Sequence, residues 1–267
     1  MSYESIKLAE IDRAVLEKPD GKEIWAKVQR NFLDHRDRVD AIEGLLASVT
    51  ADHFTGRGPP GDEFNLVNGQ RWSFDSQGPG PKQVDHLLDA HVARWTVGQG
   101  TAISLKSKRI YRPEDLPFFE ARIRVDTFAN TFLTYLGIYR ETTNVGLQPT
   151  DGVAWRKRQD KLPQFVSLSG HPDTPYIEGE VSPDLTQPET NEWFLIRIEW
   201  ITPTVIECYF NNVLSHTFAG ELGDVIPTAD QELTAGMTTS MPSGFGGNLR
   251  TDLDWIVARN TALILQP

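Results

Sequence analysis

The chain has 267 residues, and 39% of them are hydrophobic, which is enough for a sizeable core and more than a disordered chain carries. Its formal net charge of −11 disfavours nucleic acid and anionic membrane surfaces as partners. No apolar run approaches the roughly 18 residues of a membrane span. The polar start MSYESIKLAEIDRAV lacks the apolar core of a signal peptide, so we expect neither a span nor a leader.

The first 54 residues carry a helical pattern, and we expect a long helix from about residue 22 to residue 49. Its apolar positions are spaced alternately by three and four residues, which is the a/d pattern of a coiled coil. This seam consists of Trp25, Val28, Phe32, His35, Val39, Ile42, Leu46 and Val49. Because the seam is narrow, it favours self-association, with a trimer ahead of a dimer or an intramolecular helix.

Residues 55–82 are dense in glycine and proline and are interpreted as a linker. Residues 83–95 fit either a short helix or the entry to a first strand. The predicted organisation is therefore a helical attachment segment at 1–54, a linker at 55–82 and a β domain at 83–267.

From about Thr96 the hydrophobic period switches to two, as in PFFEARIRVD (117–126), which indicates a half-buried antiparallel strand. Asn211 and Asn212 separate two apolar runs and predict a hairpin with a type I′ turn. The single cysteine, Cys208, lies in one of these runs and is expected to be buried. Further strands are expected at 102–110, 132–141, 152–158, 164–169, 176–181, 193–200, 205–210, 213–218, 232–240 and 249–258. So many short strands predict a mainly β fold, an antiparallel jelly-roll sandwich behind the helical segment.

Near the C-terminus, TDLDWIVAR places two carboxylates two residues apart beside a tryptophan. Simple alternation puts Asp252 and Asp254 on one face of a strand and Leu253, Trp255 and Val257 on the other. We therefore expect the aspartates to face outward and Trp255 to plug the core.

The order of these segments resembles the concanavalin A-like lectin/glucanase jelly roll, and in particular the LamG-like version found in bacteriophage virion proteins. The resemblance covers about residues 95–260. It is carried, in order, by WTVGQGTAISL, FFEARIRVD, LTYLGIYRE, DGVAWRKRQDKLPQFVSLSG, NEWFLIRIEW, VIECYFNNVLSHTF and LDWIVAR.

The same superfamily contains retaining glycoside hydrolases, in which an acid-rich strand supplies two carboxyls about 5–5.5 Å apart. No such strand is recognisable here, since Glu141 stands alone and Glu178 and Glu180 have no third acid in register. On this basis we expect no enzymatic activity and no catalytic residues. No metal-ligand spacing is found, so we expect no cofactor. The resemblance leaves calcium held by loop carboxylates possible, but no spacing in the sequence supports it.

The resemblance implies a structural component of a phage particle, such as a homo-oligomeric head decoration protein, a fibre or a tail appendage. It would be made in the host cytoplasm and located in the virion, with further copies of itself and capsid or tail proteins as partners. The alternative is a glycan-binding module that contacts cell-surface sugars. Its candidate face for a glycan or a partner consists of Tyr135, Tyr139, Trp155, Arg156 and Arg158, although alternation leaves open whether the aromatic residues belong to the core. A glycoside hydrolase or lyase is a further alternative.

Overall fold

The computed structural model describes residues 49–52, 72–80, 82–87, 92–126, 133–140, 149–158, 161–169, 178–220, 226–228, 230–243 and 247–261. The chain divides into two units, Met1–Ala47 and Ser48–Pro267, and the described residues all belong to the second. The predicted seam from Trp25 to Leu46 lies outside them. No helix within the described ranges is long and apolar enough to cross a membrane.

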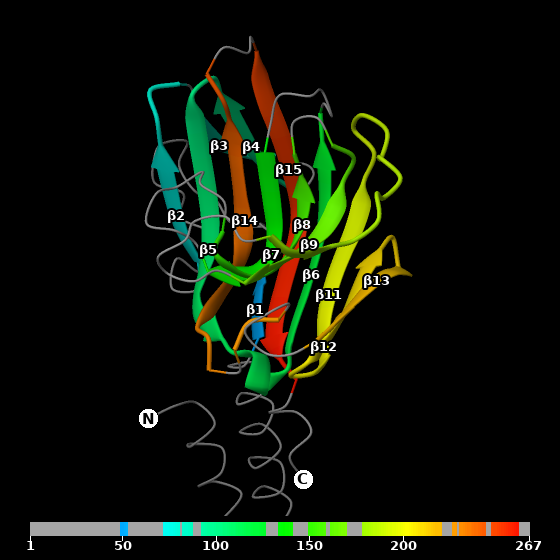
Figure 1. Ribbon diagram of the computed structural model, residues 1–267. Coiled ribbons are helices and arrows are strands. Elements are labelled where there is room, and N and C mark those ends of the chain that lie inside the picture. The colour runs from blue at the N-terminus through cyan, green and yellow to red at the C-terminus, as the bar shows by residue number, and fades with distance from the viewer. Residues whose placement is uncertain are drawn as a thin grey trace, which may run out of the picture. The chain divides into compact units, whose positions relative to one another are not determined.

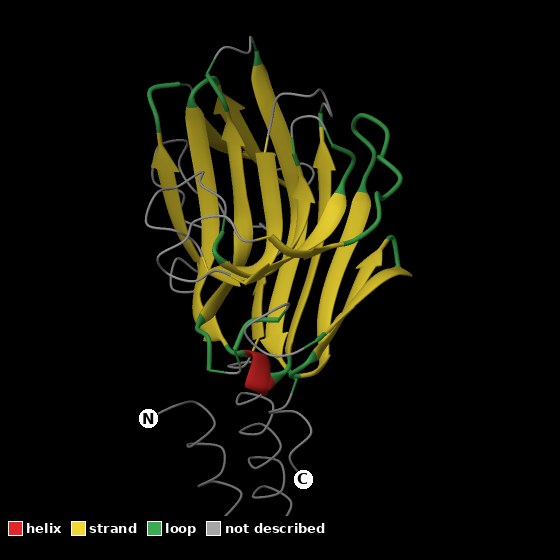
Figure 2. Cartoon of the chain, viewed as in Figure 1, coloured by secondary structure: helices red, strands yellow, loops and turns green. Residues whose placement is uncertain are grey.

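The described strands form two antiparallel sheets that face each other (Figures 1 and 2). The eight-stranded sheet has the order β13-β12-β11-β6-β15-β4-β3, with β1 pairing on β15. Its strands are β1 (Val49–Asp52), β3 (Lys82–Leu87), β4 (Val92–Gly98), β6 (Pro117–Val125), β11 (Phe194–Thr202), β12 (Val205–Phe210), β13 (Val213–Ala219) and β15 (Asn248–Asn260).

The seven-stranded sheet has the order β10-β9-β8-β7-β14-β5-β2. Its strands are β2 (Trp72–Gln77), β5 (Thr101–Tyr111), β7 (Leu133–Arg140), β8 (Asp151–Lys157), β9 (Gln164–Ser169), β10 (Glu178–Val181) and β14 (Leu233–Met241). A short 3-10 turn, Pro113–Asp115, connects β5 to β6. The predicted antiparallel β sandwich is confirmed.

The main core lies between the sheets and forms because alternate residues of each strand point inward. In β6 the inward set is Phe119, Ala121, Ile123 and Val125, all fully buried as the period-two pattern predicted. Large aromatic side chains such as Trp95 fill the space between the layers. Each such side chain contributes about 1.5–3 kcal/mol through burial.

The β12–β13 hairpin matches the sequence-based expectation. Asn211 and Asn212 have φ angles of 50° and 64°, the left-handed conformation that a type I′ turn requires at both positions. The side-chain oxygen of Asn211 also accepts a hydrogen bond from the Leu195 amide at 2.9 Å, which ties the turn to β11. Cys208 is buried, as expected, and this burial raises the pKa of its thiol.

The expectation that Trp255 plugs the core is wrong. The register of β15 against β6 shifts between Leu253 and Trp255, so one extra residue enters β15 at this point. After the bulge, Ile256 and Ala258 point into the core, while Trp255 is half-buried on the outer face. Simple alternation across the segment failed because a bulge reverses the facing of every later residue.

The N-terminal boundaries also differ from the prediction. Val49, expected to end the helical seam, is the first residue of β1 and pairs with Arg259 of β15. The predicted linker contains β2. Of the two alternatives for residues 83–95, the strand holds, since they carry most of β3 and the start of β4. These segments become strands because they form hydrogen bonds with strands that are distant in sequence, and local composition does not reveal such pairing.

Candidate functional site

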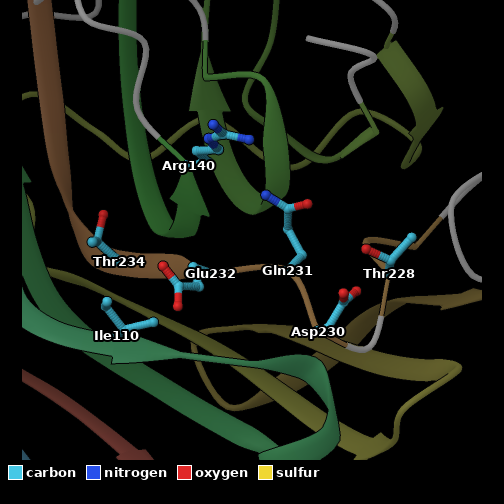
Figure 3. Close-up of a pocket in the computed structure, with 7 residues that line it drawn as sticks. All are labelled: Ile110, Arg140, Thr228, Asp230, Gln231, Glu232 and Thr234. Carbon is cyan, nitrogen blue, oxygen red and sulfur yellow. The ribbon is translucent and has the colours of Figure 1, made fainter.

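A depression of about 470 Å³ lies where the ends of β5 and β7 meet the segment that leads into β14 (Figure 3). Polar side chains dominate its lining, with one aliphatic side chain among them. The lining residues are Ile110, Arg140, Thr228, Asp230, Gln231, Glu232 and Thr234.

The position of β14 between two neighbours builds this site. Thr234 of β14 is opposite Ile110 of β5 on one side and Tyr139 of β7 on the other. Its hydroxyl donates a hydrogen bond to the Tyr139 carbonyl at 3.1 Å. Because β14 begins here, the residues just before it lie beside the last residue of β7, Arg140.

A β-bulge shapes the β5 side of the depression. The pairing with β14 shifts between Ile110 and Lys106. Ser107 stabilises the irregular segment, since its hydroxyl donates to the Arg109 carbonyl at 2.8 Å and accepts from the Ala235 amide at 3.0 Å. Bulges of this kind commonly re-aim side chains beside functional sites.

The charges of the site fall into two groups. Glu232 pairs with Arg112 at 2.9 Å, and their hydrogen bond raises the pKa of Arg112 above its ordinary value. Within the described part of the chain, the side chains of Arg140 and Asp230 form no hydrogen bond or ion pair. The depression therefore presents one guanidinium and one carboxylate to a ligand.

Polyhydroxylated ligands suit such a lining. The Asp230 and Glu232 carboxylates accept hydrogen bonds from hydroxyls, the Gln231 amide both donates and accepts, and the guanidinium only donates. No group of three His, Cys, Asp or Glu that could hold a metal ion occurs among the residues the structure describes.

Three of the residues predicted to form a glycan or partner face do lie together. Tyr135 and Arg156 are opposite each other on β7 and β8, and Tyr139 follows on the same face of β7. All three are buried, the tyrosines in a second apolar cluster outside the main core. The Tyr139 hydroxyl is 3.0 Å from that of Thr238, and Arg156 donates to the Gln164 side chain at 3.2 Å. No open aromatic platform results.

The other two members of the predicted face lie apart from it. Trp155 points into the inter-sheet core, with its ring centroid 5.4 Å from that of Phe194. Arg158 is exposed just beyond the end of β8. The intervening Lys157 is buried and donates to the carbonyls of Arg158 and Lys161 at 3.0 and 2.6 Å. Alternation along β8 thus sends consecutive members of this segment to opposite faces.

The paired carboxylates of TDLDWIVAR lie on the outer face of the eight-stranded sheet. Arg94 donates to both carboxylate oxygens of Asp252 at 2.6 and 2.8 Å, and Arg124 donates to one of them at 2.7 Å. Asp254 pairs with Arg122 at 2.8 Å. Burial alone would raise the pKa of Asp252, but the hydrogen bonds from the two arginines outweigh it and hold the pKa below its ordinary value.

The remaining acidic candidate also has a partner within the fold. Glu180 of β10 lies 2.9 Å from the His216 ring of β13, so it links the edge strands of the two sheets. The side chain of Glu178 lies outside the described residues.

Sequence reasoning did not find Arg140, Asp230 or Glu232 as site residues. The only local signal was the polar run Asp230-Gln231-Glu232 directly before a predicted strand. Nothing near it in sequence indicates Arg140, since the two segments meet only through the pairing of β7 with β14.

No protein-family model matches the chain, and no curated protein shows significant sequence similarity to it. Solved structures do match. An immunostimulatory antigen of Mycobacterium tuberculosis, described as a pseudo β-1,3-glucanase, has a TM-score of 0.55 and 13% identity. The match covers 79% of this chain and 98% of that one.

Two other matches are of similar quality. The carbohydrate recognition domain of Emp47p has a TM-score of 0.54 and 10% identity, covering 80% of this chain and 95% of that one. A GH16 protein for mixed-linkage glucan from Bacteroides ovatus, in complex with its product, has a TM-score of 0.54 and 12% identity. That match covers 78% of this chain and 98% of the other.

The structural neighbours are concanavalin A-like lectin and glucanase jelly rolls. At these identities the likeness establishes the fold alone. It confirms the predicted jelly roll, and it gives no indication of a phage virion.

The prediction that the chain is not an enzyme is overturned by these neighbours. It rested on the missing acid-rich strand, yet glucanase-type proteins share this fold with little sequence in common. A local motif is a poor criterion at 12–13% identity, because the same sheet geometry can place carboxylates from segments that are distant in sequence.

Proposed function

We propose that this protein is a carbohydrate-binding module, and that the depression at the ends of β5 and β7 receives the sugar. The observation that carries the proposal is the convergence of Arg140 and Asp230, whose side chains have no partner among the described residues, with the Gln231 amide in one concave site. The lectin and glucanase neighbours support the same class of ligand.

The buried tyrosines of β7 do not suit this role, since a sugar platform needs an exposed aromatic face. Ile110 is better placed, because it lines the depression and is 46% exposed. It would supply the apolar contact for the C–H face of a sugar ring, while the polar groups bind its hydroxyls.

Hydrolysis of a glucan is a second candidate. Glycoside hydrolysis uses two carboxyl groups that flank the scissile bond, and Asp230 and Glu232 line the same depression. The guanidinium of Arg112 lies 2.9 Å from the Glu232 carboxylate, so a cation accompanies one of the two acids and not the other. Release of reducing ends from β-glucans should then be lost in Glu232→Gln and retained in Glu189→Gln, which alters an exposed glutamate elsewhere.

The virion role inferred from the sequence stays a prediction. It is compatible with carbohydrate binding, since an appendage that contacts a cell surface would also need a glycan site. Self-association through the N-terminal seam likewise stays a prediction, since that segment lies outside the described residues.

Titration calorimetry with a panel of neutral and acidic oligosaccharides tests the proposed binding. Gln231→Ala should weaken binding about tenfold, the effect of losing one or two hydrogen bonds. Gln77→Ala, at an exposed glutamine on β2, is the matched control and should bind as the wild type does. Equal affinity of the two variants, or no binding to any sugar, would contradict the proposal.

A further inference from the structure

We infer that the depression selects an acidic sugar, an oligosaccharide with a ring carboxylate such as a uronate. In this arrangement Arg140 pairs with the carboxylate, while Asp230 and Gln231 bind ring hydroxyls. The inference rests on the proposed carbohydrate binding and adds the chemical class of the ligand.

The first step is the state of the Arg140 side chain. Figure 3 shows it among the lining residues, across from the segment that carries Gln231 and Asp230, and no carboxylate among the described residues pairs with it. A neutral sugar would displace part of the water around the Arg140 guanidinium without offering a negative charge in exchange. A carboxylate would instead accept two parallel charge-assisted hydrogen bonds from it. The guanidinium fork matches the planar geometry of a carboxylate.

The second step concerns the acids nearby, which would otherwise repel an anion. Arg112 offsets Glu232 through their 2.9 Å contact. Asp151 is opposite Arg140 in the β7–β8 register, but it is buried and its carboxylate accepts a hydrogen bond from the Thr150 hydroxyl at 3.2 Å. Among the described residues, Arg112 and Arg140 together balance Asp230 and Glu232, in a chain whose net charge is −11. Asp151 lies next to Arg140 on β8 and is not part of the lining.

The third step is the complementarity between Arg140 and Asp230. A ligand that satisfies both must present an anionic group at one end and hydroxyl donors at the other. A uronate ring does so, since its carboxylate and its ring hydroxyls project from different carbons. A simple inorganic anion would contact Arg140 alone and would leave the exposed Asp230 carboxylate to water, so it would gain less than a ligand that reaches both groups.

The arginines elsewhere in the structure support the assignment by contrast. Arg94 and Arg124 are both committed to Asp252, and Arg122 to Asp254. Arg140 differs from these residues because its guanidinium lines a concave site and has no partner in the described part of the chain.

The experiment compares a trimer of galacturonate with its methyl ester, which has the same shape without the charge, and with a neutral gluco-oligosaccharide. Trimers of mannuronate and of a sulfated galactan serve as further acidic probes. Affinities are measured by calorimetry on the full chain, and thermal unfolding verifies that each variant is folded. The wild type should bind a uronate trimer at least tenfold more tightly than the ester.

Arg140→Ala should lose about 10- to 100-fold in uronate affinity, as expected for a charge-assisted bidentate contact, and should leave binding of the ester within about twofold. Arg140→Lys keeps the charge but loses the planar fork of the guanidinium. Its affinity for the uronate trimer should lie between that of the wild type and that of Arg140→Ala. Arg250→Ala, at an exposed arginine on β15 of the other sheet, is the matched control and should bind as the wild type does.

Each contrary outcome decides a different point. Equal binding of acid and ester, with no effect of Arg140→Ala, would overturn the inference and leave carbohydrate binding standing. Preference for the sulfated probe over both uronates would overturn the assignment of a carboxylate. Failure to bind any of these sugars would overturn the proposed function itself.

Discussion

Charged side chains are paired within the fold in one region of this domain and are exposed to solvent in another. On the outer face of the eight-stranded sheet, Asp252 is almost fully buried and receives hydrogen bonds from two arginines. In the depression beside β14, the side chains of Arg140 and Asp230 are exposed and form no hydrogen bond or ion pair with described residues. The first arrangement contributes to folding, whereas the second leaves its bonding capacity for a ligand.

Aromatic side chains reinforce the outer-face arrangement. The guanidinium groups of Arg122 and Arg124 lie 5.1 and 4.7 Å from the Trp193 ring, so the arginines that hold the aspartates are themselves packed. The paired carboxylates of TDLDWIVAR thus belong to a structural network and not to a catalytic site.

Removing the central carboxylate of this network should have the largest effect. Asp252→Ala leaves Arg94 and Arg124 without their shared partner. We expect a loss of about 2 kcal/mol in the free energy of unfolding, less than for a fully buried pair because both arginines are partly exposed. Urea denaturation measures it, and a loss below about 0.5 kcal/mol would show that the network contributes little to folding.

The same carboxylate should also produce a pH dependence. Its pKa is lower in the folded state than in the unfolded chain, so its stabilisation is present above about pH 4 and is lost as the pH falls through the folded value. Asp252→Asn removes this titration. The difference in unfolding free energy between wild type and variant should be largest near neutral pH and shrink in acid, whereas a constant difference would argue against the ion pairs.

A smaller effect is expected at the neighbouring pair. Asp254 and Arg122 retain 22% and 45% of their side-chain exposure, so solvent screens their attraction. Asp254→Ala should cost about 0.5 kcal/mol by the same urea measurement. A cost equal to that of Asp252→Ala would indicate that burial does not set the ranking.

The smallest effect on folding is expected in the depression. Arg140→Ala should leave the free energy of unfolding within about 0.5 kcal/mol of the wild type, because this exposed charge has no partner among the described residues to lose. A larger loss would mean that Arg140 supports the fold, and its availability to a ligand would then be in doubt.

Much of the sandwich could be predicted from the sequence because its strands alternate and its turns carry specific residues. The fully buried inward face of β6 and the positive φ angles of Asn211 and Asn212 are examples. The bulge that turns Trp255 outward could not be predicted from the sequence, because it depends on the pairing register between β15 and β6.

The candidate site was less predictable than the fold. Arg140 and Asp230 are brought together by pairing between strands that are distant in sequence, and no spacing records this. The predicted face on β7 and β8 illustrates the converse, because residues that are close in sequence, such as Trp155 and Arg156, point to opposite sides of the sheet.

A crystal structure of the protein with a bound oligosaccharide tests the central proposal most directly. We predict that the sugar lies in the depression, with oxygen atoms within hydrogen-bond distance of Arg140, Asp230 and Gln231. A sugar ordered on another face of the domain while this depression holds only solvent would contradict the account.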